Sequence, residues 1–295
     1  MSLHVAGSIA QVKKIVTVRL QSAGIDTAHL DARLLVNHVV NRDPGWVVGN
    51  PEFVLSSSQW DHLESLVKRR ERREPLAYIF GQKEFWSFDF QVNSATLIPR
   101  SESETLVQAT LERLPRGRDA RILDLGTGTG CLLLAILSER LDTKGLGVDN
   151  SLAALAIARR NAAELGFTAR TVFRESSWFS ALNADAEGGF EAIVTNPPYV
   201  KDEEMKTLAP EIINYEPEKA LRGGVDGLDA YRQIFAGLPS FLCPGGLFVG
   251  EFGSGQVEAV RALAHDAGLA IMDVQNDLAG EPRIIVARTP KGGKK

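Results

Sequence analysis

The fold is predicted by the stretch Arg121-Ile122-Leu123-Asp124-Leu125-Gly126-Thr127-Gly128-Thr129-Gly130-Cys131. Its apolar first half is typical of a buried strand, and the glycines after it let the backbone turn tightly into a helix that begins at Cys131. The order of strand, loop and helix then repeats, with further strands expected at 145–148, 170–173, 190–194, 246–251, 271–274 and 283–287. This alternation predicts an α/β fold: a doubly wound, mostly parallel seven-stranded sheet with helices on both faces.

The first part of the chain has a different pattern. Between Ser8 and Arg73 apolar residues recur only at helical spacing, which predicts a small all-α domain. Aromatic residues then alternate around Ser87, which indicates a β-hairpin whose aromatic side chains lie in a core between domains. The predicted domains are a helical domain over 1–74, a linker with the hairpin over 75–100, and the sheet domain over 101–295.

Helix ends in this region carry polar side chains with predictable roles. Ser57 or Ser58 is expected to cap the third helix, and Ser101 is expected to form a capping box with Glu104. The third helix ends in Lys68-Arg69-Arg70-Glu71-Arg72-Arg73. We expect these charges to be solvated at the helix terminus, with contact to an acidic partner or RNA left open for Arg69, Arg70 and Arg73.

Composition restricts the class of protein. The 295 residues are 44% hydrophobic and 24% charged, as in ordinary soluble proteins, and the net charge of -4 does not favour a large nucleic-acid surface. No apolar run approaches the roughly 18 residues of a membrane span, and residues 1–7 do not resemble a signal peptide, so the expected location is cytoplasmic. Cys131 and Cys243 fit no metal-ligand spacing and are expected to be reduced, buried side chains. No metal site is predicted, and the tail 291–295 is expected to be a solvated end.

The glycine loop, residues 126–130, indicates a ligand at the start of a helix, because its glycines let the backbone approach a bound group. A dinucleotide fingerprint would place Gly or Ala where Cys131 stands, which weakens an NAD site. A second strand ends at Asp149, where a carboxylate can accept both hydroxyls of a ribose. Each residue alone also fits a tight turn or a helix cap. Together they favour an adenosine-containing ligand without a pyrophosphate.

The strand at 190–194 runs into Thr195-Asn196-Pro197-Pro198-Tyr199, and its last four residues are called the N-P-P-Y turn below. Two prolines must end the strand, which places Asn196 at the carboxyl edge of the sheet, where ligands bind. The side-chain oxygen of Asn196 and the carbonyl oxygen of Pro197 can each accept one hydrogen of a planar NH2 group, and Tyr199 can stack on its face. The alternative is a proline turn in which Asn196 only caps backbone groups.

These motifs, in this order, resemble the class I S-adenosylmethionine-dependent methyltransferases that modify planar nitrogens. Four further segments resemble the protein-(glutamine-N5) methyltransferases of peptide chain release factors, the HemK or PrmC type. They are E-P-L-A-Y-I-F-G-Q-K-E-F-W (74–86), A-T-L-I-P-R-S-E-S-E (95–104), S-W-F-S-A-L (177–182) and Y-E-P-E-K-A-L (215–221). The similarity covers nearly the whole chain, including its helical first part and the closing L-A-G-E-P-R-I-I-V-A-R (278–288).

The resemblance implies a Rossmann-like transferase that methylates a glutamine side-chain nitrogen in release factors, which act in translation termination. The implied cofactor is S-adenosyl-L-methionine, leaving S-adenosyl-L-homocysteine, and Trp178 is implied to pack on its adenine. The implied cofactor-binding residues are Asp124, Gly126, Thr127, Gly128, Thr129, Gly130, Asp149, Trp178 and Asn196. The implied catalytic residues are Asn196, Pro197 and Tyr199, and the glutamine is implied to lie against Asn196, Pro197, Pro198 and Tyr199. We expect the helical domain to dock the protein substrate.

The chain departs from the family pattern at two places. Ser177 stands where the family commonly has Asp, and Arg100-Ser101-Glu102-Ser103-Glu104 replaces R-P-D-T-E, which keeps a hydroxyl and a charge.

Three other functions are alternatives to this one. A ribosomal-protein glutamine methyltransferase would share the chemistry. An adenine-N6 nucleic-acid methyltransferase would present a flipped base at the same turn but would need a basic groove. A module that binds S-adenosylmethionine without catalysis would not need the N-P-P-Y turn.

Overall fold

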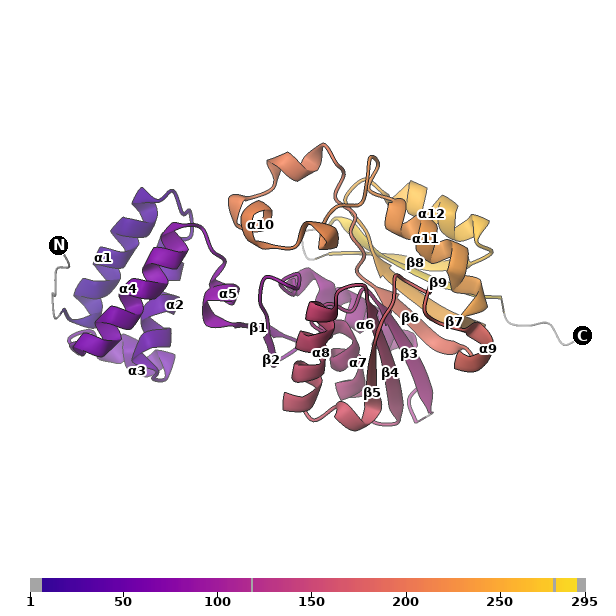
Figure 1. Ribbon diagram of the computed structural model, residues 1–295, viewed down its shortest axis with the longest axis horizontal. Coiled ribbons are helices and arrows are strands. Elements are labelled where there is room, and N and C mark those ends of the chain that lie inside the picture. Colours follow the sequence, from indigo (N-terminus) through magenta and orange to yellow (C-terminus); the bar gives the residue numbers. More distant parts are fainter. Residues whose placement is uncertain (1–6, 118, 278–279, 291–295) are drawn as a thin grey trace, which may run out of the picture. The chain divides into compact units, whose positions relative to one another are not determined.

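The computed structural model describes residues 7–117, 119–277 and 280–290 (Figure 1). They form two compact units: a helical unit of residues up to Gly81 together with Ala209–Tyr215, and a sheet unit of the rest. Within the described ranges, no helix is long and apolar enough to cross a membrane. The expectations for residues 1–6 and for the tail 291–295 lie outside the described residues.

The helical unit is built around one apolar core. It contains α1 (Ile9–Ser22), α2 (Ala28–Val40), α3 (Pro44–Gly49), α4 (Ser57–Glu71), α5 (Leu76–Phe80) and α10 (Pro210–Tyr215). Its fully buried residues include Val12, Leu20, Leu35, Val36, Leu63 and Val67. Their spacing in the sequence follows the helical repeat, which is why the helical character of this region could be predicted. The short helices α3 and α10 were not predicted.

The cap of α4 differs from the prediction. Ser56, rather than Ser57 or Ser58, caps the helix: its hydroxyl accepts from the Gln59 amide at 3.2 Å. The Gln59 side chain in turn accepts from the Ser56 amide at 3.0 Å. Three consecutive serines offer three possible caps, and Ser56 is the one that has Gln59 three residues later, as a capping box requires.

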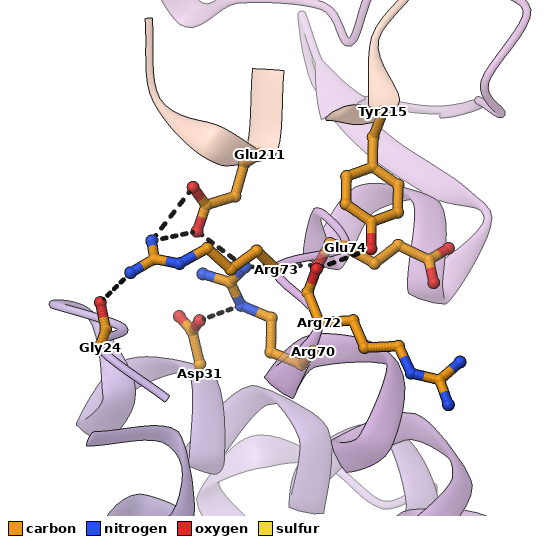
Figure 2. A network of polar contacts seen from close by, with 8 residues as sticks. All are labelled: Gly24, Asp31, Arg70, Arg72, Arg73, Glu74, Glu211 and Tyr215. Carbon is orange, nitrogen blue, oxygen red and sulfur yellow. Dashed lines mark hydrogen bonds and ion pairs between the residues drawn. The ribbon is translucent and has the colours of Figure 1, made fainter. Parts of the chain in front are cut away.

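The three arginines at the basic end of α4 whose contacts were left open, Arg69, Arg70 and Arg73, all pair with acidic side chains. The Arg70 side chain is only 7% exposed, and its Nε donates to Asp31 at 2.7 Å. A second donor of Arg70 contacts Glu211 of α10 at 3.1 Å, and Arg73 contacts the same carboxylate at 3.2 Å (Figure 2). Arg69 pairs with Glu74. The acidic partner left open in the sequence is therefore a residue of the same chain.

The segment that carries α10 is held by a further contact. The Tyr215 hydroxyl donates to the carbonyl oxygen of Arg72 at 2.7 Å (Figure 2). The chain therefore leaves the sheet unit after Leu208, packs on the helical unit through Ala209–Tyr215, and returns at Glu216. Sequence periodicity could not predict this, because the segment is separated from α4 by the whole first half of the sheet unit.

The sheet unit contains a seven-stranded sheet in the order β5-β4-β3-β6-β7-β9-β8. Its strands are β3 (Ala120–Leu125), β4 (Thr143–Asp149), β5 (Thr171–Glu175), β6 (Phe190–Thr195), β7 (Leu242–Glu251), β8 (Ala270–Asn276) and β9 (Pro282–Arg288). Among the described strands of this sheet, the pairs β7 with β9 and β8 with β9 are antiparallel and the other four pairs are parallel. The prediction of a doubly wound, mostly parallel seven-stranded sheet is confirmed.

Helices cover both faces of this sheet (Figure 1). One apolar cluster joins strand residues such as Ile122 and Val194 to α6 (Glu104–Arg113), α7 (Cys131–Glu139) and α8 (Leu152–Glu164). The other joins Leu123 and Ile193 to α11 (Asp229–Gly237) and α12 (Val257–Asp266), near the short α9 (Ala184–Glu187). Neighbouring residues thus face opposite layers, as the two-residue repeat of a strand requires. Each fully buried aliphatic side chain contributes about 1.5–3 kcal/mol.

The predicted hairpin is present as β1 (Gln82–Phe85) and β2 (Phe88–Gln91). Phe85 and Phe90 are buried in the core of the sheet unit, beside α8, rather than in a separate core between domains. The expected position of these aromatics is therefore corrected. Side chains of the hairpin belong to the same apolar cluster as α6, α7 and α8, which cover one face of the sheet.

The capping box predicted at Ser101 is wrong. Ser101 lies in a 3-10 turn, Ser101–Ser103, and α6 begins at Glu104 without a side-chain cap. The Glu104 carboxylate instead accepts from the Trp86 amide at 2.8 Å. The Ser103 hydroxyl donates to Glu251. Hydrogen bonds to distant residues have replaced the local capping interaction. The 3-10 turn carries Ser103, which lines the cavity described next.

Candidate active site

The carboxyl ends of three neighbouring strands meet at one point of the sheet edge. Leu125, the last residue of β3, pairs with Val148 of β4 and with Thr195 of β6. The Thr195 hydroxyl donates to the Leu125 carbonyl at 2.8 Å. The strand order changes direction between β3 and β6. This is the switch point at which doubly wound sheets bind ligands.

A cavity of about 290 Å³ opens at this point, within the sheet unit. Both predicted motifs contribute to its wall. The predicted site residues in its lining are Gly126, Thr127, Gly128, Thr129, Asp149, Trp178, Asn196 and Pro198. Four others do not line the cavity that the described residues form: Asp124, Gly130, Pro197 and Tyr199. The glycine loop and the N-P-P-Y turn therefore share one cavity, although 65 residues or more separate them in sequence.

Glycine is required in this loop for two different reasons. Gly128 has a φ of +54° and lines the cavity, so its bare backbone is presented to whatever binds there. Gly130 has a φ of +81° at the start of α7, and a Cβ there would meet Ala158 at 3.4 Å. Gly130 thus shapes the turn, whereas Gly128 faces the ligand.

A half-buried carboxylate, Asp149, lies beside the loop, and a fully buried one, Asp124, lies behind it. Asp149 accepts from the amides of Gly128 and Ser151, each at 2.9 Å, and burial raises its pKa while these donors lower it. Asp124 is fully buried and accepts from the Thr127 hydroxyl at 2.6 Å. Its other oxygen, Oδ1, has no hydrogen-bond partner among the residues that the structure describes. Burial, opposed by the Thr127 hydrogen bond and aided by the charge of Asp149, raises the pKa of Asp124 to about 7.

Trp178 is half-buried in the cavity wall and has a φ of +51°, a conformation that costs energy in any residue except glycine. The turn is held by Ser176, whose hydroxyl donates to the Trp178 carbonyl at 2.8 Å and accepts from the Ala181 amide at 3.1 Å. A Cβ on Gly126 would lie 3.6 Å from the indole. The ring is thus held in an unusual orientation across from the glycine loop, as is common at ligand sites.

The N-P-P-Y turn is anchored on several sides. Asn196 is half-buried, and its Nδ2 donates to the Ser103 hydroxyl at 3.1 Å. The Tyr199 hydroxyl donates to Glu251 at 3.0 Å, and the Tyr199 carbonyl accepts from Gln256 at 2.9 Å. Burial, with the nearby charge of Glu251, raises the pKa of Tyr199, so its phenol stays protonated. These contacts fix the turn, and Tyr199 is used as an anchor rather than as part of the cavity wall.

Sequence reasoning missed Ser103 and Glu251. Glu251 is 3% exposed and accepts from the Ser103 hydroxyl at 2.5 Å, although 148 residues separate the two. It also missed the buried Glu216, which accepts from the Ile98 amide at 3.1 Å and from Arg100, a cavity residue. Ser103 and Glu216 fall in segments that carried the family resemblance, 95–104 and 215–221, whereas no sequence signal pointed to Glu251. Neither pair follows any local periodicity.

Cys131 lines the cavity as a protonated thiol. It and Cys243 are half-buried rather than buried as predicted. Burial raises the pKa of Cys131 to about 12, which keeps the thiol protonated near neutral pH. Among the described residues, no group of three or more His, Cys, Asp or Glu side chains could hold a metal ion.

Comparisons with known proteins agree with this site. Residues 11–81 match the family model of the PrmC N-terminal domain, and residues 102–225 match that of the methyltransferase small domain. A release factor glutamine methyltransferase of Rhodospirillum rubrum is 42% identical over 275 residues, which cover 93% of this chain and 83% of that protein. A release factor glutamine methyltransferase of Caulobacter vibrioides is 41% identical over 268 residues, which cover 91% of this chain and 92% of that protein. A solved methyltransferase of Pyrococcus furiosus, 15% identical, has a TM-score of 0.53 over 76% of this chain and 98% of its own, which shows the fold alone.

Proposed function

This chain belongs to the family of release factor glutamine methyltransferases, and on that premise we propose that it methylates the side-chain amide nitrogen of a glutamine in a peptide chain release factor. The methyl donor is S-adenosyl-L-methionine, and the products are N5-methylglutamine and S-adenosyl-L-homocysteine. The observation that carries the proposal is the shared cavity, which the glycine loop and Asn196 both line. A cofactor and an amide bound there would be adjacent.

The residues around the cavity fit the cofactor. Asp149 would accept the ribose hydroxyls, Trp178 would pack on the adenine, and the backbone of the glycine loop would lie against the rest of the ligand. Gly128, with a φ of +54°, leaves bare backbone in the cavity wall at a position where a side chain would be strained. When bound, S-adenosyl-L-methionine supplies a methyl group on a positively charged sulfur.

The chain itself provides alignment. An amide nitrogen is a poor nucleophile because its lone pair is delocalised. We assign to the Asn196 side-chain oxygen and the Pro197 carbonyl the task of accepting the two hydrogens of the glutamine amide, which directs the nitrogen toward the methyl group. Pro198, in the cavity wall, lies against the substrate, and Tyr199 holds the turn through Glu251. As the N–CH3 bond forms and the CH3–S bond breaks, the nitrogen must lose one hydrogen, and this proton leaves to water after the transfer, so the division of roles needs no general base among the cavity residues.

Methyl-labelled S-adenosyl-L-methionine tests the substrate class directly. The protein is incubated with a peptide chain release factor, with ribosomal protein, or with DNA, and we expect label in the release factor. The net charge of -4 supports a protein substrate over a nucleic acid. Label in DNA, or in ribosomal protein but not in the release factor, would refute the proposal.

We further propose that the reaction takes place in the cytoplasm.

We also propose that the helical unit docks the release factor. It has its own apolar core and presents exposed apolar side chains, such as Val18 and Leu30, which are 54% and 44% exposed. Amides of α1 and α2 should therefore gain protection from hydrogen exchange when the release factor binds in the presence of S-adenosyl-L-homocysteine. Protection confined to residues 82–208 and 216–290 would contradict a docking role.

A further inference from the structure

The orientation of the Asn196 amide decides whether it can bind a substrate amide. Its two ends have nearly the same shape but opposite hydrogen-bonding character: Oδ1 accepts, and Nδ2 donates. A glutamine NH2 group needs an acceptor. We propose that Ser103 and Glu251 are positioning residues that hold Asn196 with its oxygen toward the substrate. This inference rests on the proposed function and names the residues that enforce it.

The order of donors and acceptors in the chain of contacts supports this assignment. The carboxylate of Glu251 can only accept, so the single hydroxyl hydrogen of Ser103 is directed to it, at 2.5 Å. The Ser103 oxygen then offers only lone pairs to Asn196, which must turn its NH2 group toward it, at 3.1 Å. Oδ1 is left for the cavity. The direction of every bond therefore follows from the charge at one end.

Glu251 is itself firmly held. Its other carboxylate oxygen accepts from the Tyr199 hydroxyl at 3.0 Å, and its backbone carbonyl accepts from Tyr231 of α11 at 2.7 Å. Glu251 and Ser103 are both only 3% exposed. A rigid, buried acceptor of this kind fixes the partner that bonds to it, because any other orientation leaves a buried group unpaired.

Protonation of Glu251 would remove the hydrogen-bond order that orients the Asn196 amide. A carboxylic acid can donate to Ser103, whose hydrogen could then point to Asn196 and draw Oδ1 away from the cavity. Asn196 would present NH2 to the NH2 group of the substrate, two donors with no acceptor between them. The charged and titratable groups that face Glu251 are Tyr199, Tyr231, Arg283 and Glu102. Burial raises the pKa of Glu251, while its hydrogen bonds and Arg283 lower it, with a net rise.

A raised pKa means that the ionised, aligning form is lost earlier as the pH falls than for an ordinary glutamate, so kcat/KM should decline toward acid on passing through the pKa of Glu251. A group with a purely structural role in the apolar core would produce no such dependence on the protonation of one carboxylate.

Three variants test the inference: Ser103→Ala, Ser103→Thr and Glu251→Gln. Ser103→Ala should lower kcat/KM for the release factor by about 10-fold to 100-fold, as for the loss of other orienting partners, while the Kd for S-adenosyl-L-homocysteine changes less than about twofold. Its Kd for the release factor, measured calorimetrically with S-adenosyl-L-homocysteine present, should rise as well. Ser103→Thr, which restores the hydroxyl, should recover most of the lost activity. In Glu251→Gln the decline toward acid should be weaker than in the unmodified protein, because the part that Glu251 causes is lost. The part that Asp124 and Asp149 contribute is common to both proteins, so the ratio of the two kcat/KM values isolates Glu251.

The inference is overturned if Ser103→Ala keeps the kcat/KM of the unmodified protein, if Ser103→Thr is as impaired as Ser103→Ala, or if Glu251→Gln shows the same decline toward acid. Thermal unfolding of each variant with S-adenosyl-L-homocysteine controls for loss of the fold. Failure of the proposed function would be different: the unmodified protein itself would not label the release factor. Unchanged labelling by Ser103→Ala would refute only the role of Ser103.

Discussion

Asn196→Ala should lower kcat/KM for release factor methylation by on the order of 100-fold to 1,000-fold, the size of effect seen when one preorganised polar group at a reacting centre is removed. The side chain supplies one of the two acceptors for the glutamine NH2 group, and without it the nitrogen is free to rotate away from the methyl donor. Asn196 is also one of the residues that line the cavity, so its removal enlarges the site only locally. The cofactor Kd should therefore change by no more than a few-fold.

Initial rates at saturating cofactor, together with calorimetric binding of S-adenosyl-L-homocysteine, measure both quantities. Asn276→Ala is the matched control, because this exposed asparagine ends β8 and does not line the cavity. It should behave as the unmodified protein. If Asn196→Ala retains more than about a tenth of the activity, or if it loses cofactor binding as strongly as turnover, Asn196 does not have the assigned role.

Asp31→Ala should destabilise the helical unit by about 3–5 kcal/mol, because it leaves a buried guanidinium without its main partner. The side chains of Asp31 and Arg70 are only 4% and 7% exposed and are joined at 2.7 Å (Figure 2). Glu211 still contacts Arg70 at 3.1 Å, which places the expected loss toward the lower end. Exposed ion pairs, in contrast, contribute about 1 kcal/mol or less.

Native-state hydrogen exchange of amides in α2 and α4 reports the free energy of unfolding of this unit alone, which a single melting curve of a two-unit protein does not. Asp61→Asn serves as the control, since Asp61 is an exposed carboxylate on α4. Its effect should stay within about 0.5 kcal/mol. Equal, small effects for both variants would show that the pair of Asp31 and Arg70 contributes nothing beyond a surface contact.

The parts of the site that could be predicted from the sequence are those determined by short stretches of chain. The glycine loop follows directly on a strand, and Asn196 stands before two prolines that must end another. Because parallel strands present their carboxyl ends at one edge, two local observations were enough to place both motifs together. In the structure, Leu125 at the end of β3 pairs with Thr195 at the end of β6, which brings the two motifs together.

The parts that could not be predicted depend on partners far away in the sequence. Ser103 was read through its neighbours as part of a helix start, whereas its partner Glu251 lies at the end of β7. For Arg70 the sequence left open whether an acidic partner binds it, and the structure shows a contact with Glu211, which lies 141 residues further along the chain. Local patterns report hydrophobic faces and backbone constraints well. They do not report which distant polar group satisfies a buried one.

In the proposed mechanism, the N-P-P-Y turn holds a glutamine amide beside the methyl donor. The most direct measurement is tandem mass spectrometry of a release factor after incubation with this protein and S-adenosyl-L-methionine that carries a deuterated methyl group. We predict one labelled methyl group on the side-chain nitrogen of a single glutamine, and its loss with Asn196→Ala. A methyl group on any other type of atom, or undiminished labelling by Asn196→Ala, would contradict this mechanism.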